Sequence, residues 1–189
     1  ISAAYLKSLT QYPDVEVVAI GDLDAARAQE RAAEFGVPAA GTSDAVLANP
    51  DVELVCNLTI PAVHVDVSQQ AIQHGLHVWS EKPLGLTRDS ARSLLDAADS
   101  AGLRVGCAPD TVLGPGVQTV LRRLAAGEIG RPFSGLAMFT NAGPDLWHPS
   151  PEFLFAVGGG PTLDIGPYYL AALVLALGPV VRVSAAGGR

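Results

Sequence analysis

The chain has 189 residues, of which 49% are hydrophobic and 16% charged, and its net charge is −7 at pH 7. This length allows one large domain, or one domain and part of another. The acidic balance and the lack of a Lys/Arg cluster argue against nucleic acid as a partner. The longest apolar run, 168–177, is too short to cross a bilayer. It predicts a buried helix, and no association with a membrane is expected.

The residues capable of metal or thiol chemistry are few and scattered. Cys56 and Cys107 both lie in apolar, strand-like runs, where a free cysteine behaves as a small hydrophobic residue. Two such cysteines do not form a disulfide framework, so a reducing cytoplasm is predicted, and no signal peptide is visible. Four separate histidines and the absence of a spaced carboxylate cluster indicate that there is no metal site.

The first 107 residues alternate between helical and strand-like patterns. Helices are expected at 1–9, 25–35, 43–48, 62–74 and 87–101, and strands at 15–20, 52–58, 76–79 and 103–107. Each strand is apolar almost throughout, which is typical of a parallel sheet covered by helices on both faces. We therefore predict an α/β domain with a doubly wound parallel sheet over residues 1–108.

The pattern changes after residue 107. A helix is expected at 117–126, a strand at 133–141, an irregular loop at 143–157, a helix at 162–177 and a strand at 180–185. These elements indicate a second, incomplete domain over residues 109–189.

Asp22 follows the strand predicted at 15–20. In a dinucleotide-binding fold, an acidic residue at this position binds the adenosine ribose, about 20 residues after a glycine-rich fingerprint. That count places the fingerprint at or before Ile1, so we expect a Rossmann-type sheet without its first strand and glycine-rich loop. Asp24 is an alternative ribose ligand, and Asp22 is equally consistent with an ordinary turn aspartate. A carboxylate here favours NAD over NADP, whereas Arg27 would soften the repulsion of a 2′-phosphate.

The strand at 76–79 runs directly into Glu81-Lys82-Pro83. In open α/β sheets, ligands bind at the carboxyl ends of the strands, so Lys82 is placed where it can donate or accept a proton in catalysis. The other interpretation is a surface lysine that begins a loop.

Several motifs together resemble the glucose–fructose oxidoreductase/inositol dehydrogenase (Gfo/Idh/MocA) family over essentially the whole chain. They are Pro61, His64 and Gly75, the run Glu81-Lys82-Pro83-Leu84, the turn at 127–130 and the glycine-rich run at 158–166. The resemblance implies a Rossmann domain followed by part of an α/β domain with an open, largely antiparallel sheet. Because chains of the family are longer, we expect this one to be truncated at both ends.

The resemblance also implies a catalytic group made of Lys82, Asp164 and Tyr168. The implied reaction is reversible oxidation of a secondary alcohol on a sugar, cyclitol or similar polyol by hydride transfer to NAD, with NADP possible. Asp164 and Tyr168 are four residues apart and would share a helix face, although Pro167 fits only the first turn of a helix. Either Tyr168 or Lys82 serves as the base, and Tyr168 is alternatively a core aromatic residue.

For the cofactor, the resemblance implies contacts from Thr59, Pro61 and His64 along the nicotinamide half. Glu81 is expected to form a hydrogen bond with the cofactor ribose or with the backbone nearby. Lys82 is implied at the nicotinamide itself. His64 is equally consistent with a role in capping its helix.

For the substrate, Trp147 and His148 are expected to line the sugar site, because aromatic rings stack on sugar faces and a histidine supplies a polar contact. The resemblance implies a contact with the cofactor or the substrate at Asp110. Asp110 stands where the family commonly has asparagine. Trp147 and His148 are alternatively part of a packing loop between domains.

Three hypotheses follow for the chain: an enzyme, a non-catalytic dinucleotide-sensing or protein-binding homologue, or an inactive fragment of the enzyme. The joint presence of Lys82, Asp164 and Tyr168 favours the enzyme. Open sheet edges in the second domain predict a homo-oligomer formed through the C-terminal sheet.

Overall fold

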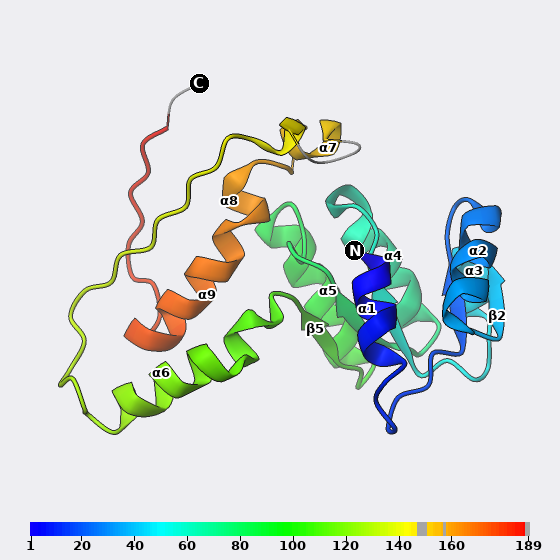
Figure 1. Cartoon of the computed structure of the whole chain (residues 1–189), viewed down its shortest axis with the longest axis horizontal. Helices are drawn as coiled ribbons and strands as arrows, with labels where there is room; N and C mark the ends of the chain where they lie inside the picture. The colour runs from blue at the N-terminus through cyan, green and yellow to red at the C-terminus, as the bar shows by residue number, and fades with distance from the viewer. Residues whose placement is uncertain (147–150, 157, 188–189) are drawn as a thin grey trace. The chain divides into compact units, whose positions relative to one another are not determined.

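The computed structural model describes residues 1–146, 151–156 and 158–187. The chain divides into two compact units, Ile1–Cys107 and Ala108–Arg189 (Figure 1). Trp147 and His148, which we predicted to contact the substrate, lie outside the described residues.

The first unit alternates helices and strands, which confirms an α/β fold with parallel sheets. Its helices are α1 (Ser2–Leu9), α2 (Ala25–Phe35), α3 (Ser43–Leu47), the short 3-10 helix η1 (Pro61–Val63), α4 (His64–Gln73) and α5 (Arg88–Ser100). Its strands are β1 (Ala19–Gly21), β2 (Ala39–Gly41), β3 (Leu54–Asn57), β4 (His77–Ser80) and β5 (Val105–Cys107).

The strands form two separate parallel sheets. In one, β1 pairs with β2, so that Ala19 lies opposite Ala39. In the other the order is β3-β4-β5, and Trp79 in the middle strand lies between Cys56 and Gly106. Within the described ranges, no strand joins β1 to β3. The carboxyl ends of β3, β4 and β5 therefore share one edge of a three-stranded sheet.

The main core lies between this three-stranded sheet and helices α4 and α5. Leu94 and Ala98 are one helical turn apart on α5 and are both buried, and Val78 of β4 belongs to the same cluster. Thr87 begins α5 as a cap, because its hydroxyl accepts a hydrogen bond from the Ser90 N–H. A smaller core of Leu6, Ala32 and Val37 joins α1 to α2.

The second unit is helical in its described part. Its elements are the 3-10 helix η2 (Asp110–Leu113), α6 (Pro115–Ala125), the 3-10 helix η3 (Pro144–Leu146), α7 (Glu152–Phe155), α8 (Pro161–Asp164) and α9 (Gly166–Leu177). Pro167 lies in the first turn of α9, the position that a proline tolerates.

The strands predicted at 133–141 and 180–185 are not formed. Both segments lack strand assignment, and the expected open antiparallel sheet is absent from the described residues, whose paired strands are all parallel. An extended segment becomes a strand only when a neighbour satisfies its backbone N–H and C=O groups. The apolar side chains of these segments stay exposed instead, as in Phe133 at 95% and Val181 at 98%.

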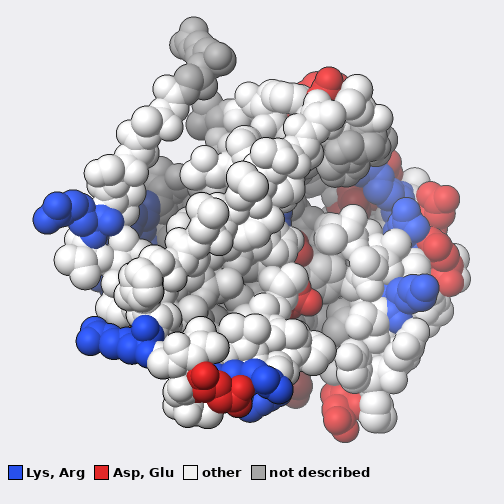
Figure 2. All heavy atoms as spheres, turned by 60° about the vertical axis from the view of Figure 1, so that its left-hand side comes forward, with Lys and Arg blue, Asp and Glu red and all other residues white. Residues whose placement is uncertain are grey.

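No helix among the described residues is both long enough and apolar enough to cross a membrane. On the face shown in Figure 2, acidic and basic side chains occur in small separate groups. Arg31 with Glu34 and Arg123 with Glu128 are such local, exposed ion pairs, which contribute little to stability.

Candidate functional site

Lys82 is held at the carboxyl edge of the three-stranded sheet by the residue that precedes it. The Glu81 N–H donates to the Asn57 carbonyl oxygen at 2.9 Å, so the chain is still tied to β3 as it leaves β4. On the other side, the Cys107 thiol at the end of β5 donates to the Glu81 carbonyl oxygen at 3.7 Å. Lys82 therefore follows directly on a backbone fixed at the edge where open α/β sheets bind ligands.

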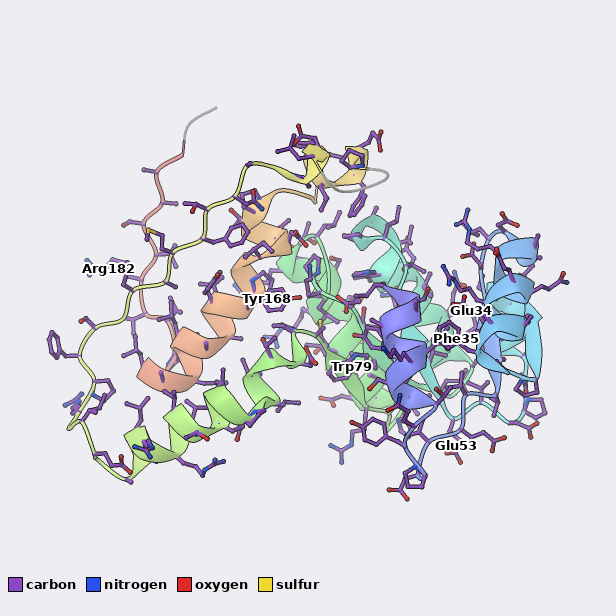
Figure 3. The ribbon with its side chains drawn as sticks, viewed as in Figure 1. Glu34, Phe35, Glu53, Trp79, Tyr168 and Arg182 are labelled. Carbon is purple, nitrogen blue, oxygen red and sulfur yellow. The ribbon has the colours of Figure 1, made fainter. Side chains whose placement is uncertain are left out.

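The Glu81 carboxylate has a hydrogen-bond partner at each oxygen. The Tyr5 hydroxyl on α1 donates to Oε1 at 2.8 Å, and the Lys82 N–H donates to Oε2 at 3.1 Å. Trp79 Nε1 in turn donates to the Tyr5 hydroxyl at 3.2 Å; Figure 3 marks Trp79 beside α1. The chain Trp79–Tyr5–Glu81 thus joins α1 to the end of β4.

The Tyr5 hydroxyl stays protonated in this environment. Burial raises the pKa of Tyr5 far above its ordinary value, and the bond to the Glu81 carboxylate adds to the rise. The hydrogen bond from Trp79 opposes this effect but does not cancel it. Tyr5 is therefore a neutral donor to Glu81 throughout the physiological pH range.

Asn57, the last residue of β3, organises the loop that follows it. Its Nδ2 donates to the His64 carbonyl oxygen at 2.9 Å and to Ser68 Oγ at 3.0 Å. Its Oδ1 accepts from the Thr59 N–H and from the Thr59 hydroxyl, at 3.2 and 2.7 Å. Asn57 is 2% exposed, and a buried amide with all its bonds made fixes the backbone around it.

His64 lies beneath this loop. Its ring is 1% exposed, with Nδ1 2.7 Å from the Pro83 carbonyl oxygen and Nε2 2.9 Å from the Thr59 carbonyl oxygen. It is the first residue of α4, and no side chain caps that helix. The sequence-based alternative of a helix-capping histidine is therefore wrong: the ring bridges the loops that follow β3 and β4.

The structure places the predicted cofactor residues on the two sheets of the first unit. Thr59, Glu81 and Lys82 lie in the loops at the ends of β3 and β4, and Pro61 begins η1. Asp22 directly follows β1, and its N–H donates to the Gly41 carbonyl oxygen on β2.

The carboxylates of Asp22 and Asp24 have different local roles. Asp24 caps α2 by accepting from the Ala26 and Arg27 N–H groups. Asp22 Oδ1 accepts from the Asp24 N–H at 2.9 Å and lies 3.8 Å from Arg27 Nη1. Because the cap occupies Asp24, Asp22 is the better candidate for a ribose hydroxyl.

The two thiols near Glu81 are poor nucleophiles. Burial raises the pKa of Cys56 and of Cys107 from 9.0 to about 11, and the charge of Glu81 adds to both shifts. Nucleophilic chemistry needs the thiolate, so these cysteines act as apolar packing residues.

Asp164 and Tyr168 belong to the second unit but not to one helix. Asp164 is the last residue of α8, and Tyr168 lies in the first turn of α9, which begins at Gly166. The predicted shared helix face is therefore wrong, because the chain turns at Ile165 between the two helices. Asp110, predicted to contact the substrate, begins η2 and is exposed.

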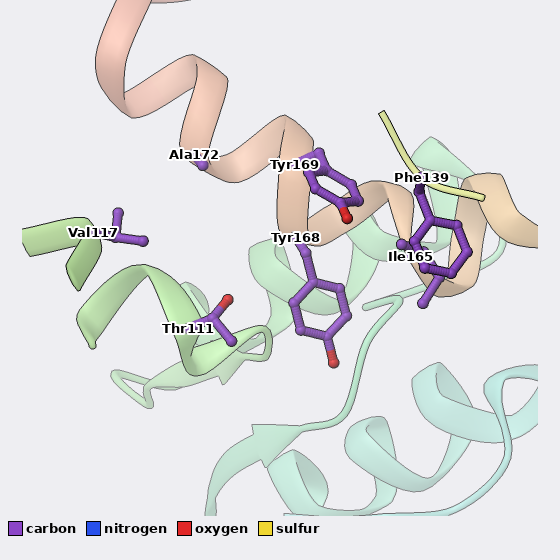
Figure 4. Close-up of a pocket in the computed structure, with 7 residues that line it drawn as sticks. All are labelled: Thr111, Val117, Phe139, Ile165, Tyr168, Tyr169 and Ala172. Atoms are coloured by element: carbon purple, nitrogen blue, oxygen red, sulfur yellow. The ribbon is translucent and has the colours of Figure 1, made fainter. Parts of the chain in front are cut away.

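Tyr168 lines a pocket of about 390 Å³ within the second unit (Figure 4). The other lining residues are Thr111, Val117, Phe139, Ile165, Tyr169 and Ala172. The Phe139 and Tyr169 rings are tilted against each other with centroids 6.4 Å apart. Apart from the hydroxyls of Thr111 and the two tyrosines, the side chains of this pocket are apolar.

Tyr5, Trp79 and Asn57 contribute to the site but were missed from the sequence. Asn57 was detectable, because a polar amide ending an otherwise apolar strand is unusual unless it is satisfied. Tyr5 carried no such signal, since its partner Glu81 is 76 residues away.

Comparison with protein families gives matches to both parts of the chain. The family described as "Oxidoreductase family, NAD-binding Rossmann fold" matches residues 1–108. The GFO/IDH/MocA C-terminal domain matches residues 117–189.

Curated relatives are similar over nearly the whole chain. A dTDP-3,4-didehydro-2,6-dideoxy-alpha-D-glucose 3-reductase from Streptomyces antibioticus is 36% identical, over 95% of this chain and 54% of its own. A D-xylose 1-dehydrogenase (NADP(+)) from Haloferax volcanii is 31% identical, over 93% of this chain and 54% of its own. The chain therefore spans about half the length of the curated relatives it matches.

Solved structures are also similar to this chain over nearly its whole length. A 3-ketoreductase from Actinomadura kijaniata, crystallised with NADP and TDP-benzene, superposes with a TM-score of 0.81 at 31% identity, covering 92% of this chain and 53% of that one. A protein of gentamicin A biosynthesis in complex with NAD gives a TM-score of 0.75 at 28% identity, covering 92% of this chain and 50% of that one.

Proposed function

This chain belongs to the Gfo/Idh/MocA family of oxidoreductases, and from that premise we propose that it carries the working residues of an NAD(P)-dependent enzyme. The enzyme interconverts a secondary alcohol and a ketone on a sugar, cyclitol or similar small polyol. The observation that carries this proposal is the placement of Lys82, held through Glu81 at the carboxyl edge of the three-stranded sheet.

The first unit, with its two parallel sheets, is the dinucleotide-binding part. Asp22 would accept hydrogen bonds from the adenosine ribose, and its carboxylate favours NAD. Arg27 lies 3.8 Å from that carboxylate, and its positive charge would reduce the repulsion of a 2′-phosphate, so NADP is also a possible cofactor. Thr59 and Pro61, in the loop that Asn57 fixes, would border the nicotinamide half. When bound, the cofactor supplies the acceptor or donor of hydride.

The residues of the chain orient the substrate and transfer its hydroxyl proton. During oxidation a base removes the hydroxyl proton as the carbon loses hydride, and the same group returns the proton in the reverse direction. Tyr168 and Lys82 are the two candidates for this base. Asp164, at the end of α8, would orient the substrate hydroxyl.

The pocket beside Tyr168 narrows the substrate class. Apart from the hydroxyls of Thr111, Tyr168 and Tyr169, its walls are apolar and offer few partners for additional hydroxyls, and burying an unpaired hydroxyl is costly. A sugar that lacks one or more ring or C6 hydroxyls fits such walls better than a fully hydroxylated one. The similarity to a reductase of a dideoxy sugar nucleotide supports this choice.

We further propose that the protein is a cytoplasmic homo-oligomer. The free, protonated thiols Cys56 and Cys107 are consistent with a reducing compartment. The exposed apolar side chains in 133–141 and 180–185 would pack in an open, largely antiparallel sheet at the interface between copies.

The chain offers a matched test of Lys82, because it contains only two lysines. Lys82→Ala and Lys7→Ala are compared with the unchanged chain in fluorescence titrations with NADH and NADPH, and in turnover of a panel of sugars and inositols. Lys7 is exposed on α1 and serves as the control.

We expect saturable cofactor binding in all three proteins. Turnover should fall about 100-fold or more in Lys82→Ala alone, as for the loss of an acid–base group. Binding of the dinucleotide without turnover of any sugar, cyclitol or polyol would contradict the enzyme and support the sensing homologue. A chain that binds neither dinucleotide would contradict the proposal for this chain and indicate the inactive fragment.

A further inference from the structure

We propose that Tyr5 and His64 are positioning residues that hold Lys82 through its two neighbours in the chain, Glu81 and Pro83. The inference rests on the proposed function for the role of Lys82 itself. The positioning contacts are independent of that role: two residues from distant elements bond to Glu81 and Pro83, the residues on either side of the lysine.

The first contact acts on the amino-terminal side of Lys82. Tyr5 donates to Glu81 Oε1 at 2.8 Å, which orients the carboxylate so that Oε2 accepts the Lys82 N–H at 3.1 Å. Tyr5 is itself oriented by the Trp79 N–H. Glu81 therefore has a positioning role that needs no contact with a ligand, since its carboxylate links Tyr5 to the Lys82 backbone.

The second contact acts on the carboxyl-terminal side. His64 Nδ1 lies 2.7 Å from the carbonyl oxygen of Pro83, and a carbonyl oxygen can only accept. This bond therefore needs a proton on Nδ1, just as the contact of Nε2 with the Thr59 carbonyl oxygen at 2.9 Å needs a proton on Nε2. The ring is 1% exposed, so water does not replace this bond when it is lost.

Both contacts matter because Lys82 has a long, flexible side chain. A catalytic amine is effective only when the backbone that carries it is placed within a fraction of an ångström. The hydrogen bonds to Glu81 and Pro83 supply that placement from α1 and α4, which pack against different parts of the unit.

A chain labelled with 15N-lysine gives only two lysine backbone amide signals, from Lys7 and Lys82, and Lys82→Arg assigns them. The variants are Tyr5→Phe, which removes one hydroxyl, and His64→Gln, which keeps an amide donor. Tyr12→Phe and His74→Gln are the matched controls, because Tyr12 is 59% exposed and His74 lies on the surface of its helix. Leu94→Ala in the core is the control for general destabilisation.

In Tyr5→Phe, we expect the Lys82 signal to move and its hydrogen exchange to become about tenfold faster, because the Lys82 N–H bonds to the carboxylate that Tyr5 orients. In His64→Gln, the Lys82 signal should move while that of Lys7 stays in place. The three controls should leave Lys82 unchanged. In the turnover assay, both variants should lower kcat while KM for the cofactor stays close to that of the unchanged chain.

An unmoved Lys82 amide in Tyr5→Phe would overturn the proposal, as would an equal shift in Leu94→Ala. If His64→Gln does not fold, 15N-histidine spectra of the unchanged chain still test the second contact, and a His64 ring without a proton on Nδ1 would refute it. These spectra need neither cofactor nor substrate. Full turnover in Lys82→Ala would therefore exclude Lys82 from the proposed chemistry, and no turnover in the unchanged chain would refute the proposed function, while the positioning result stays intact in both cases.

Discussion

The indole of Trp79 covers Gly106 on the neighbouring strand β5. The two residues are in register, and a Cβ added at Gly106 would lie 2.6 Å from Cε3 of the indole. No side chain larger than a hydrogen leaves the indole in place there. The glycine thus permits the position from which Trp79 Nε1 reaches the Tyr5 hydroxyl.

Replacing Gly106 with alanine should displace this indole. We expect Gly106→Ala to lower the free energy of unfolding by about 1–3 kcal/mol, the usual cost of overpacking. Urea denaturation measures this change, and the tryptophan emission should shift with it. Gly116→Ala on α6 is the control, because nothing lies near its added Cβ and alanine favours a helix. Equal stability of the two variants would contradict the close contact.

Loss of the Asn57 side chain should destabilise the first unit. Asn57→Ala leaves the Ser68 hydroxyl and the His64 carbonyl without this partner in a buried region, and it also removes the acceptor of the Thr59 N–H. We expect a decrease of about 3 kcal/mol in the free energy of unfolding, from thermal or urea melting. Asn49→Ala removes only a turn bond to the Asp51 N–H and should cost less than about 1 kcal/mol. Similar losses in both variants would argue against a buried network.

The two thiols should resist alkylation in the folded protein. A rise in pKa from 9.0 to about 11 lowers the thiolate fraction of Cys56 and Cys107 at pH 8 about 100-fold. Iodoacetamide should therefore label both cysteines about 100-fold more slowly in the native chain than in urea. Peptide mass spectrometry follows each residue separately, and fast native labelling at pH 8 would contradict the burial.

The same pKa shifts predict how stability depends on alkaline pH. The folded state binds these two protons more tightly than the unfolded state, because the pKa values are raised. The stabilising contribution is complete at neutral pH and is lost as the pH rises from 9.0 through about 11. The decrease in the free energy of unfolding with rising pH should be smaller in the double variant Cys56→Ala/Cys107→Ala. If the double variant shows the same decrease, groups other than the two thiols cause it.

Asp22 should decide between the two dinucleotides. In Asp22→Asn we expect weaker NADH binding by about tenfold, because a hydrogen bond to a charged group is lost, and tighter NADPH binding, because the repulsion of its 2′-phosphate is removed. Fluorescence titration gives both dissociation constants. Asp44→Asn, an exposed residue of α3, is the charge-matched control. An unchanged ratio of the two constants would exclude Asp22 from the ribose site.

The apolar pocket should distinguish sugars that differ by one hydroxyl. Methyl D-fucoside and methyl D-galactoside differ only at C6, and we expect the first to have a KM about tenfold lower or better. Ile165→Thr places a hydroxyl in the pocket wall and should reduce this ratio. A preference for the galactoside would contradict the deoxysugar proposal.

The alternating apolar runs predicted most of the first unit, because each such run carries a local signal. The runs at 52–58 and 103–107 contain β3 and β5, the run at 76–79 covers β4 except for its last residue, and the parallel pairing follows from the helices between the strands. The short β2 was missed because Ala39, Ala40 and Gly41 have none of the branched or aromatic side chains that indicate a strand. The strands predicted at 133–141 and 180–185 are not formed, because a strand depends on a neighbour that its own residues do not specify.

The sequence by itself determined the fold class of the first unit and the place of Lys82 at the end of a strand, since both follow from residues that are close together in the chain. Only the tertiary structure decided what holds Lys82 there. Tyr5 meets Glu81 across 76 residues, and His64 meets Pro83 across 19. Such hydrogen bonds exist only after α1 and α4 have packed, because burial creates the need for a partner and packing decides which partner is in reach.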